Sequence, residues 1–577
     1  MTRETKTKPK PKAKKAATAP NLTVAGAIKS LADLMKASEI PRPLQYAPEL
    51  AWIFALRFLD ECETREATEA EAQGMPFTPT LAAPFRWQDW AAPDAPTRSG
   101  KKSRVAKFVQ QSLLPVLKAL KNKPNATPRQ RVVSEIVSGV EHSRIEPEAN
   151  LLEVLDTVHE LGRETVDESQ LFSAATAESP LAQVFDGLLL KMGGKLQDGA
   201  QFFTPPAVVH TMVRMLALKA GNSVYDPACG TGGFLVAAAA AMPGGHSAAV
   251  PAHVLRGREN DAAMYSVALA NLLIHGITEP RLLRGGIPST AAPEPGAHAP
   301  DTFDGVLANL SHAAPDEKDA LVPDDSRAGV EQMLRHVLQS LHAGSRCALI
   351  LDDLVLRDTQ ALVPVKHQLL EECDVHCIVT LPAGMLPSAD PTVRTNLVFL
   401  EKGRPTERTW YYALPEPAAG KKIALAASHF EEFFRLLPER PEGERSWTSD
   451  LTARCQAAFA QARPDRETAN AANARAAALE DAMATARETD DTPPDEIHPL
   501  EEPRKAALHE AREAEARAVA IENTVYDLRA VNPHRYAADS PGQVDNARVA
   551  QLLVTLEDQG REVDGALARL RALLGKE

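Results

Sequence analysis

The residues best suited to chemistry lie in a glycine-rich stretch that follows a short apolar segment. The apolar segment Ser223–Tyr225 leads into Asp226, and the glycine-rich turn is followed by the alanine-rich run Leu235–Met242, which has strong helix propensity. Glycines let a backbone turn sharply and approach a ligand closely, and the N–H groups at a helix start favour an electronegative partner. The pattern predicts the first strand–turn–helix unit of a nucleotide-binding sheet, although an ordinary turn would have the same composition.

Three neighbouring motifs favour a nucleotide site over an ordinary turn. The segment Gly199–Pro206 precedes the glycines, and Glu259 follows a second short strand about 25 residues after them, the spacing of an acid that binds ribose hydroxyls. Further on, Phe303–Asn309 is predicted to be a strand that ends in asparagine. Because the sites of open α/β sheets lie at the carboxyl ends of the strands, Asn309 is expected at the same edge.

In this order, the motifs resemble those of S-adenosylmethionine-dependent DNA adenine-N6 methyltransferases. The resemblance is greatest to the modification subunit of type I restriction–modification systems, and it covers roughly residues 25 to 435. It implies an enzyme, a site-specific adenine DNA methyltransferase, whose cofactor is S-adenosyl-L-methionine. The implied cofactor-binding residues are Phe203 and Thr204 at the methionine end, together with Asp226, Ala228, Gly230, Gly232 and Glu259.

The resemblance also implies how the target base is handled. An exocyclic amine needs two acceptors for its hydrogens rather than a strong base, and the base must leave the duplex to be reached. The implied catalytic residues are Asn309, through its side-chain oxygen, Leu310, through its carbonyl, and His312, by stacking on the base. The family has Asn-Pro-Pro followed by an aromatic residue, so Leu310 lacks the fixed φ of proline. An acid that the family usually places after the third strand is replaced by Arg284.

These departures leave two functions open. The first is methylation of adenine N6 in a type I-like restriction–modification or phage-defence system. The alternative is a catalytically degenerate subunit that binds DNA, cofactor or partner subunits without methylating. A nicotinamide dehydrogenase is disfavoured because a regular Gly-x-Gly-x-x-Gly motif is absent from the sequence.

The predicted fold class is α/β, with a Rossmann-like methyltransferase sheet of parallel, doubly wound strands. An N-terminal helical domain precedes it and a C-terminal helical tail follows it. Strands at 375–381 and 395–401 are expected to be the last of the sheet, and residues 451–489 and 502–523 to form a helical hairpin. A last amphipathic helix is expected at 544–574. The predicted domains are a disordered basic tail (1–21), the helical domain (22–166), the methyltransferase domain (167–440) and a helical assembly region (441–577).

The amino-acid composition of the chain restricts which binding partners and which cellular compartment are expected. A net charge of −13 is unusual for a protein that holds DNA alone, because phosphates require clustered Lys and Arg. We therefore expect double-stranded DNA together with a DNA-specificity subunit, with a second copy of the chain and a nuclease or translocase subunit left open. The six scattered cysteines suggest no metal site, and no apolar run has the length of a membrane span, so a cytoplasmic protein is expected.

Overall fold

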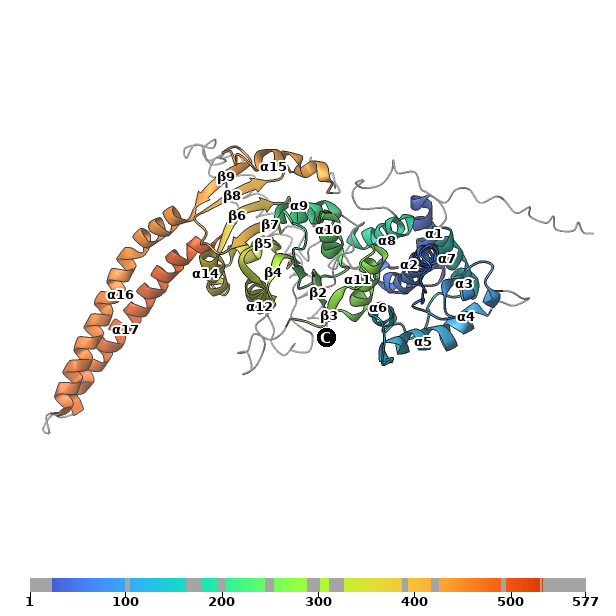
Figure 1. Cartoon of the computed structure of the whole chain (residues 1–577). Coiled ribbons are helices and arrows are strands. Elements are labelled where there is room, and N and C mark those ends of the chain that lie inside the picture. Colours follow the sequence, from blue (N-terminus) through green and yellow to red (C-terminus); the bar gives the residue numbers. More distant parts are fainter. Residues whose placement is uncertain are drawn as a thin grey trace, which may run out of the picture.

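The structure is a computed structural model with a central sheet, a cluster of helices at one end and a long helical hairpin at the other (Figure 1). The N-terminal helices lie beside the first half of the sheet, and the hairpin extends from its second half. Among the described residues, no helix is long and apolar enough to cross a membrane. The structure describes residues 23–98, 104–161, 179–194, 203–243, 254–287, 301–310, 326–386, 393–416, 425–488, 494–529 and 532.

The N-terminal domain is built on one long helix, α2 (Pro43–Ala72), whose first half is apolar on every side. Trp52 and Phe54 are fully buried there and Phe58 is nearly so. The other helices pack around this half. They are α1 (Val24–Ala37), α3 (Trp87–Trp90), α4 (Val105–Phe108), α5 (Leu114–Ala119), α6 (Pro128–Ile136) and α7 (Glu148–Glu160).

The sheet confirms the predicted α/β class and has nine strands in the order β3-β2-β1-β4-β5-β7-β6-β8-β9. The first five strands pair in parallel, but β7 is antiparallel to both β5 and β6, and β9 is antiparallel to β8. The strands are β1 (Val224–Asp226), β2 (Leu255–Glu259), β3 (Arg281–Arg284), β4 (Phe303–Asn309), β5 (Leu341–Asp352), β6 (Cys373–Thr380), β7 (Thr395–Lys402), β8 (Arg408–Ala413) and β9 (Ser446–Asp450).

Two sequence expectations about this sheet were wrong. The sheet is mixed rather than wholly parallel, because β7 runs antiparallel to both of its neighbours, β5 and β6, and β9 runs antiparallel to β8. The strands β6 and β7 are also not the last ones. Since β9 ends at Asp450, the sheet extends beyond residue 440, where we expected the helical region to begin.

Helices cover both faces of the sheet. One face packs against α9 (Pro206–Leu216), α10 (Gly233–Ala241) and α11 (Ala262–Ile274), and α11 also contacts α2, α6 and α8 (Pro180–Leu190), which joins the sheet to the N-terminal domain. The opposite face packs against α12 (Ser326–Gln339), α13 (Asp353–Arg357) and α14 (Val363–Glu372). A short helix, α15 (Glu431–Leu436), lies near β8 and β9 (Figure 1).

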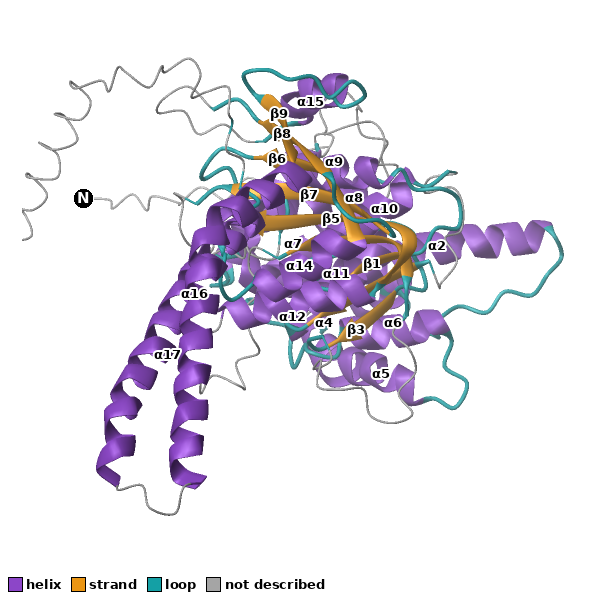
Figure 2. Cartoon of the chain, turned by 90° about the vertical axis from the view of Figure 1, so that its left-hand side faces the viewer, coloured by secondary structure: helices purple, strands orange, loops and turns teal. Residues whose placement is uncertain are grey.

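The predicted helical hairpin is confirmed by α16 (Leu451–Glu488) and α17 (Pro494–Glu522), which run side by side away from the sheet (Figure 2). Ion pairs such as Arg475–Glu510 (2.6 Å) and Arg517–Asp465 (2.9 Å) link the two helices along their flanks. Small side chains let the helix backbones approach closely, and the buried alanines of the seam are Ala458, Ala462, Ala469, Ala472, Ala476, Ala507, Ala511, Ala514 and Ala518. The basic tail at 1–21 and the expected helix at 544–574 lie outside the described residues.

The chain returns from the hairpin to the sheet through a segment that we call the strap, residues 523–529. Lys366 of α14 is only 2% exposed, and its ammonium donates to the carbonyls of Leu356 (2.8 Å), Asp358 (2.6 Å) and Tyr526 (3.1 Å). Burial lowers the pKa of Lys366 to about 8. The strap is further held because the Leu528 N–H donates to the same Leu356 carbonyl at 3.0 Å.

We expect Lys366→Met to loosen the strap. The substitution leaves three carbonyls without their charged donor, and we expect it to lower the free energy of unfolding by about 2 kcal/mol. Thermal unfolding and amide hydrogen exchange of residues 523–529 measure this effect. Lys505→Met, at an exposed position on α17, is the matched control and should leave both readouts unchanged. Equal exchange in the two variants would contradict the prediction.

Candidate active site

The site lies where the strand order of the sheet changes direction. From β1 the chain continues to β2 and β3 on one side, whereas β4 and β5 pair on the other side, so β1 and β4 border the switch point. Ligands of open α/β sheets bind in the crevice outside the carboxyl ends of such strands. Asp226 is the last residue of β1 and Asn309 the last of β4. The structure therefore places these two side chains on either side of the expected ligand position.

Asp226 is fully buried, and only one of its two carboxylate oxygens has a hydrogen-bond partner among the described residues. Its Oδ1 accepts the Ala228 N–H at 3.1 Å, whereas Oδ2 is buried and has no hydrogen-bond partner in the described structure. Burial raises the pKa of Asp226 to about 8, and the neighbouring carboxyl of Glu259 acts in the same direction. A buried acceptor without a partner is costly, so Oδ2 marks a position where a ligand donor would be stabilising.

Glu259, the last residue of β2, hydrogen-bonds to the backbone of the glycine-rich turn. Its Oε2 accepts the Gly230 N–H at 2.8 Å and its Oε1 accepts the Asp261 N–H at 2.7 Å. Burial raises the pKa of Glu259 to about 7, although both N–H groups oppose this shift. The sequence predicted an acid that binds ribose hydroxyls, and the carboxylate can accept a further hydrogen bond beyond those from the backbone. The contact with Gly230 was not predicted.

The turn between β1 and α10 needs glycine for its backbone conformation. Gly230 has φ +54° and Gly232 has φ +80°, in the left-handed region that other residues rarely adopt. Asn271 of α11 holds the turn from behind, because its Nδ2 donates to the Thr231 carbonyl at 2.8 Å. The sequence motifs did not identify Asn271 as part of the site. An asparagine within the otherwise apolar run 262–274 is the signal that could have identified it.

The structure brings Thr204 and Asn309 together across about a hundred residues of sequence. Asn309 Nδ2 donates to Thr204 Oγ1 at 3.2 Å, where Thr204 lies just before the first turn of α9. Phe203 instead packs its ring on Gly193, where an added Cβ would lie 2.7 Å from the ring. The structure thus links Thr204 to the asparagine and Phe203 to the core.

Leu310 is more firmly held than its sequence suggested. Its N–H donates to the Ile350 carbonyl of β5 at 3.0 Å, which extends the β4–β5 pairing by a bond that proline could not make. Its side chain is 1% exposed, in the core beneath α12. This bond holds the peptide between Asn309 and Leu310, whereas the expectation that the Leu310 carbonyl is less rigidly placed than in the family motif stays a prediction. His312 lies outside the described residues.

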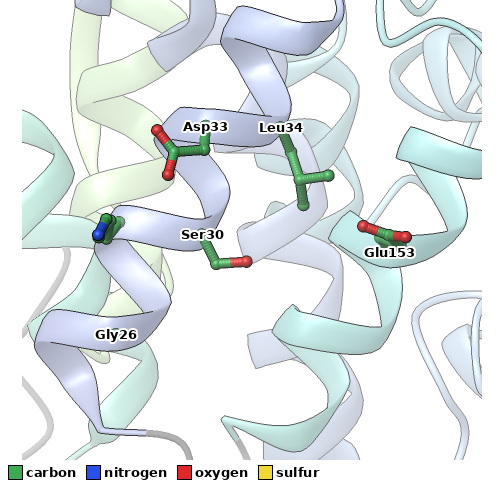
Figure 3. A pocket seen from close by; sticks show the side chains of 6 residues that line it. Gly26, Ser30, Asp33, Leu34 and Glu153 are labelled. Atoms are coloured by element: carbon green, nitrogen blue, oxygen red, sulfur yellow. The ribbon is translucent and has the colours of Figure 1, made fainter.

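A separate hollow lies in the N-terminal domain, between α1 and α7 (Figure 3). Its lining includes Ser30, Asp33 and Leu34 on α1 and Glu153 on α7. Ser30 points toward the gap, whereas the Asp33 carboxylate points away from Glu153 (Figure 3). The hollow is distant from the carboxyl edge of the sheet in Figure 1 and shares no residue with the site at Asp226 and Asn309.

Comparison with known families identifies the part of the chain that contains this site. The family model described as N-6 DNA methylase matches residues 177–456, from just before α8 to the start of α16. Residues 177–456 belong to the N-6 DNA methylase family. The methylase domain thus includes Asp226, Glu259 and Asn309, together with β8 and β9.

Similarity to known proteins extends beyond the methylase domain. The chain is 27% identical over 423 residues to the type I restriction enzyme EcoEI methylase subunit of Escherichia coli, covering 71% of this chain and 82% of that protein. It is also 27% identical to the EcoKI methylase subunit of Escherichia coli K12, covering 45% and 53% of the two chains.

Solved structures show the same fold. A modification subunit assigned to a type I restriction enzyme of Vibrio vulnificus YJ016 has a TM-score of 0.59 at 24% identity, covering 76% of this chain and 94% of that one. A chain from a type I restriction–modification assembly also has a TM-score of 0.59 at 24% identity, and there the coverage is 96% and 98%.

Proposed function

We propose that this chain is the methylase subunit of a type I restriction–modification system and that it methylates adenine N6 in DNA. The observation that carries the proposal is the switch point itself, where Asn309 ends the strand next to Asp226 and the buried Oδ2 of Asp226 has no hydrogen-bond partner among the described residues. Membership of the N-6 DNA methylase family and similarity to methylase subunits support the same reaction.

The described residues fit S-adenosylmethionine. The orphaned, buried Oδ2 of Asp226 offers an acceptor for a donor of the cofactor, and Glu259 offers its remaining lone pairs to the ribose hydroxyls. The positive φ angles at Gly230 and Gly232 favour glycine there, and a glycine has no side chain to keep a ligand away from the backbone. When bound, S-adenosylmethionine supplies an electrophilic methyl group.

The chain's own residues hold and polarise the adenine. The base must leave the duplex to reach the sheet edge. We propose that Asn309 Oδ1 accepts one hydrogen of the amino group and that the Leu310 carbonyl accepts the other, which localises the nitrogen lone pair for attack. Holding the amine in line with the methyl group is then the main catalytic contribution of the protein. His312 is proposed to stack on the base.

We propose double-stranded DNA and a DNA-specificity subunit as partners, in the cytoplasm. The net charge of −13 disfavours DNA binding by this chain alone, so a partner that contributes basic surface is expected. The hairpin α16–α17 projects from the sheet domain and is the part of the described chain best placed to reach another subunit (Figure 2).

A map of N6-methyladenine by native-DNA sequencing tests the proposed function. The map is made in a host that carries the gene and its neighbours, in the same host without the gene, and after the gene is returned. We expect one methylated sequence motif that is lost on deletion and restored on complementation. A host in which the protein is expressed and folded, but whose map is identical to that of the deletion strain, would exclude methylation.

A further inference from the structure

The contact between Thr204 and Asn309 has a consequence for catalysis. An asparagine side chain presents a carbonyl oxygen on one side and an NH₂ group on the other. The target amino group needs acceptors, so only one of the two orientations related by a half-turn of the Asn309 amide is productive. In the opposite orientation, the NH₂ group of Asn309 would face the NH₂ group of adenine, and two donors would be opposed.

In the structure, Thr204 is hydrogen-bonded to the amide in the productive orientation. Its Oγ1 accepts from Asn309 Nδ2 at 3.2 Å, which directs Oδ1 away from Thr204. We propose that Thr204 is a positioning residue that fixes the Asn309 amide with its oxygen toward the target base. This role rests on the proposed methylation and differs from the contact with the cofactor's methionine end expected from sequence.

The residues on both sides of Thr204 hold its backbone in place. Pro205 and Pro206 follow it directly and restrict the backbone. The Pro205 carbonyl accepts the N–H groups of Val208 (2.9 Å) and Val209 (3.1 Å) at the start of α9, and both valines are buried against the sheet. On the other side of Thr204, Phe203 packs against Gly193. The hydroxyl is therefore presented from a packed helix start.

The backbone at Asn309 is held as well as its side chain. The Leu310 N–H is bound to the Ile350 carbonyl of β5, so the backbone after Asn309 follows the sheet. Thr204 holds the side chain of Asn309, and β5 holds the backbone after it. Together these two contacts hold both the side chain and the backbone of Asn309 at the end of β4.

The test compares Thr204→Val, which removes the hydroxyl at nearly constant volume, with Thr204→Ser, which keeps it. Thr211→Val is the matched control, because Thr211 is a buried threonine on α9, the helix that follows Thr204, and its hydroxyl donates to the Ala207 carbonyl (2.8 Å). Each variant is assembled with its natural partner subunits, and single-turnover methylation is measured on DNA from the deletion host at saturating S-adenosylmethionine. Cofactor affinity and thermal stability are measured separately by calorimetry.

We expect Thr204→Val to lower the methylation rate by about 10- to 100-fold, with cofactor affinity changed by less than about threefold. Thr204→Ser should recover most of the rate, and Thr211→Val should match wild type. An unchanged rate in Thr204→Val would overturn the inference alone. A defect in Thr204→Val that is seen only below saturating S-adenosylmethionine would also overturn the inference, because it would assign Thr204 to cofactor binding. A wild-type complex that does not methylate would overturn the proposed function as well.

Discussion

Asn309→Ala is expected to abolish methylation while leaving the cofactor site intact. Asn309 lies at the end of β4, and its side chain bonds to Thr204 rather than to the glycine-rich turn. Its replacement removes one of the two proposed acceptors of the adenine amino group. Loss of one preorganised hydrogen-bonding group from an active site typically costs about 100- to 1000-fold in rate. We therefore expect a loss of that order in single-turnover methylation, with S-adenosylmethionine binding within a few-fold of wild type.

The control for this prediction is Asn125→Ala, at an exposed position before α6, which should methylate at the wild-type rate. Both variants should give the same melting temperature within about 2 °C, because Asn309 is half-buried and the N–H groups of β4 remain paired. If Asn309→Ala methylates at the wild-type rate, the assignment of the acceptor is wrong.

The sequence predicted the strands and turn that form the site because their signals are local. Asp226 at the end of an apolar segment, the glycines after it and the alanine-rich helix all lie within a short stretch, and propensity alone is sufficient there. The strand Phe303–Asn309 was predicted with the bounds that the structure has. The direction of β7 could not be predicted in this way, because a buried strand such as Thr395–Lys402 has the same composition whichever way it runs.

The contacts that bind the site together were not predictable from local pattern. The bond from the Leu310 N–H to Ile350 depends on the register of β4 against β5, and the Glu259 contact with Gly230 depends on the register of β1 against β2. Neither register can be predicted from the sequence of one strand alone. The absence of proline at position 310 predicted a less rigid backbone, but it did not predict that the Leu310 N–H would bond to Ile350.

Asp226→Asn is expected to have opposite effects on cofactor binding and on stability. The buried Oδ2 is the proposed acceptor for the cofactor, and an amide at this position places an NH₂ group either there or against the Ala228 N–H. We expect S-adenosylmethionine to bind about 100-fold more weakly, the effect of losing a buried charge-assisted hydrogen bond. The same change removes a buried carboxyl, so the cofactor-free protein should melt at a higher temperature than wild type.

The dependence of both effects on pH follows from the raised pKa of Asp226. Burial raises this pKa to about 8, above the value of the unfolded chain, so the contribution of the group to stability is lost as pH rises through 8. The melting-temperature advantage of Asp226→Asn should therefore grow between pH 6 and pH 9. Wild-type cofactor affinity should rise over the same range, because the ionised carboxylate is the better acceptor.

In Asp226→Asn, the rise in affinity with pH should be confined to the lower part of the range. Glu259 remains in the variant, and burial raises its pKa to about 7, so its ionisation is nearly complete by pH 8. Calorimetric titration with S-adenosylmethionine at pH 6, 7, 8 and 9 separates the two acids. Parallel pH profiles for wild type and variant would show that Asp226 does not titrate in the site, and the unpartnered Oδ2 would then lose its proposed role as the cofactor's acceptor.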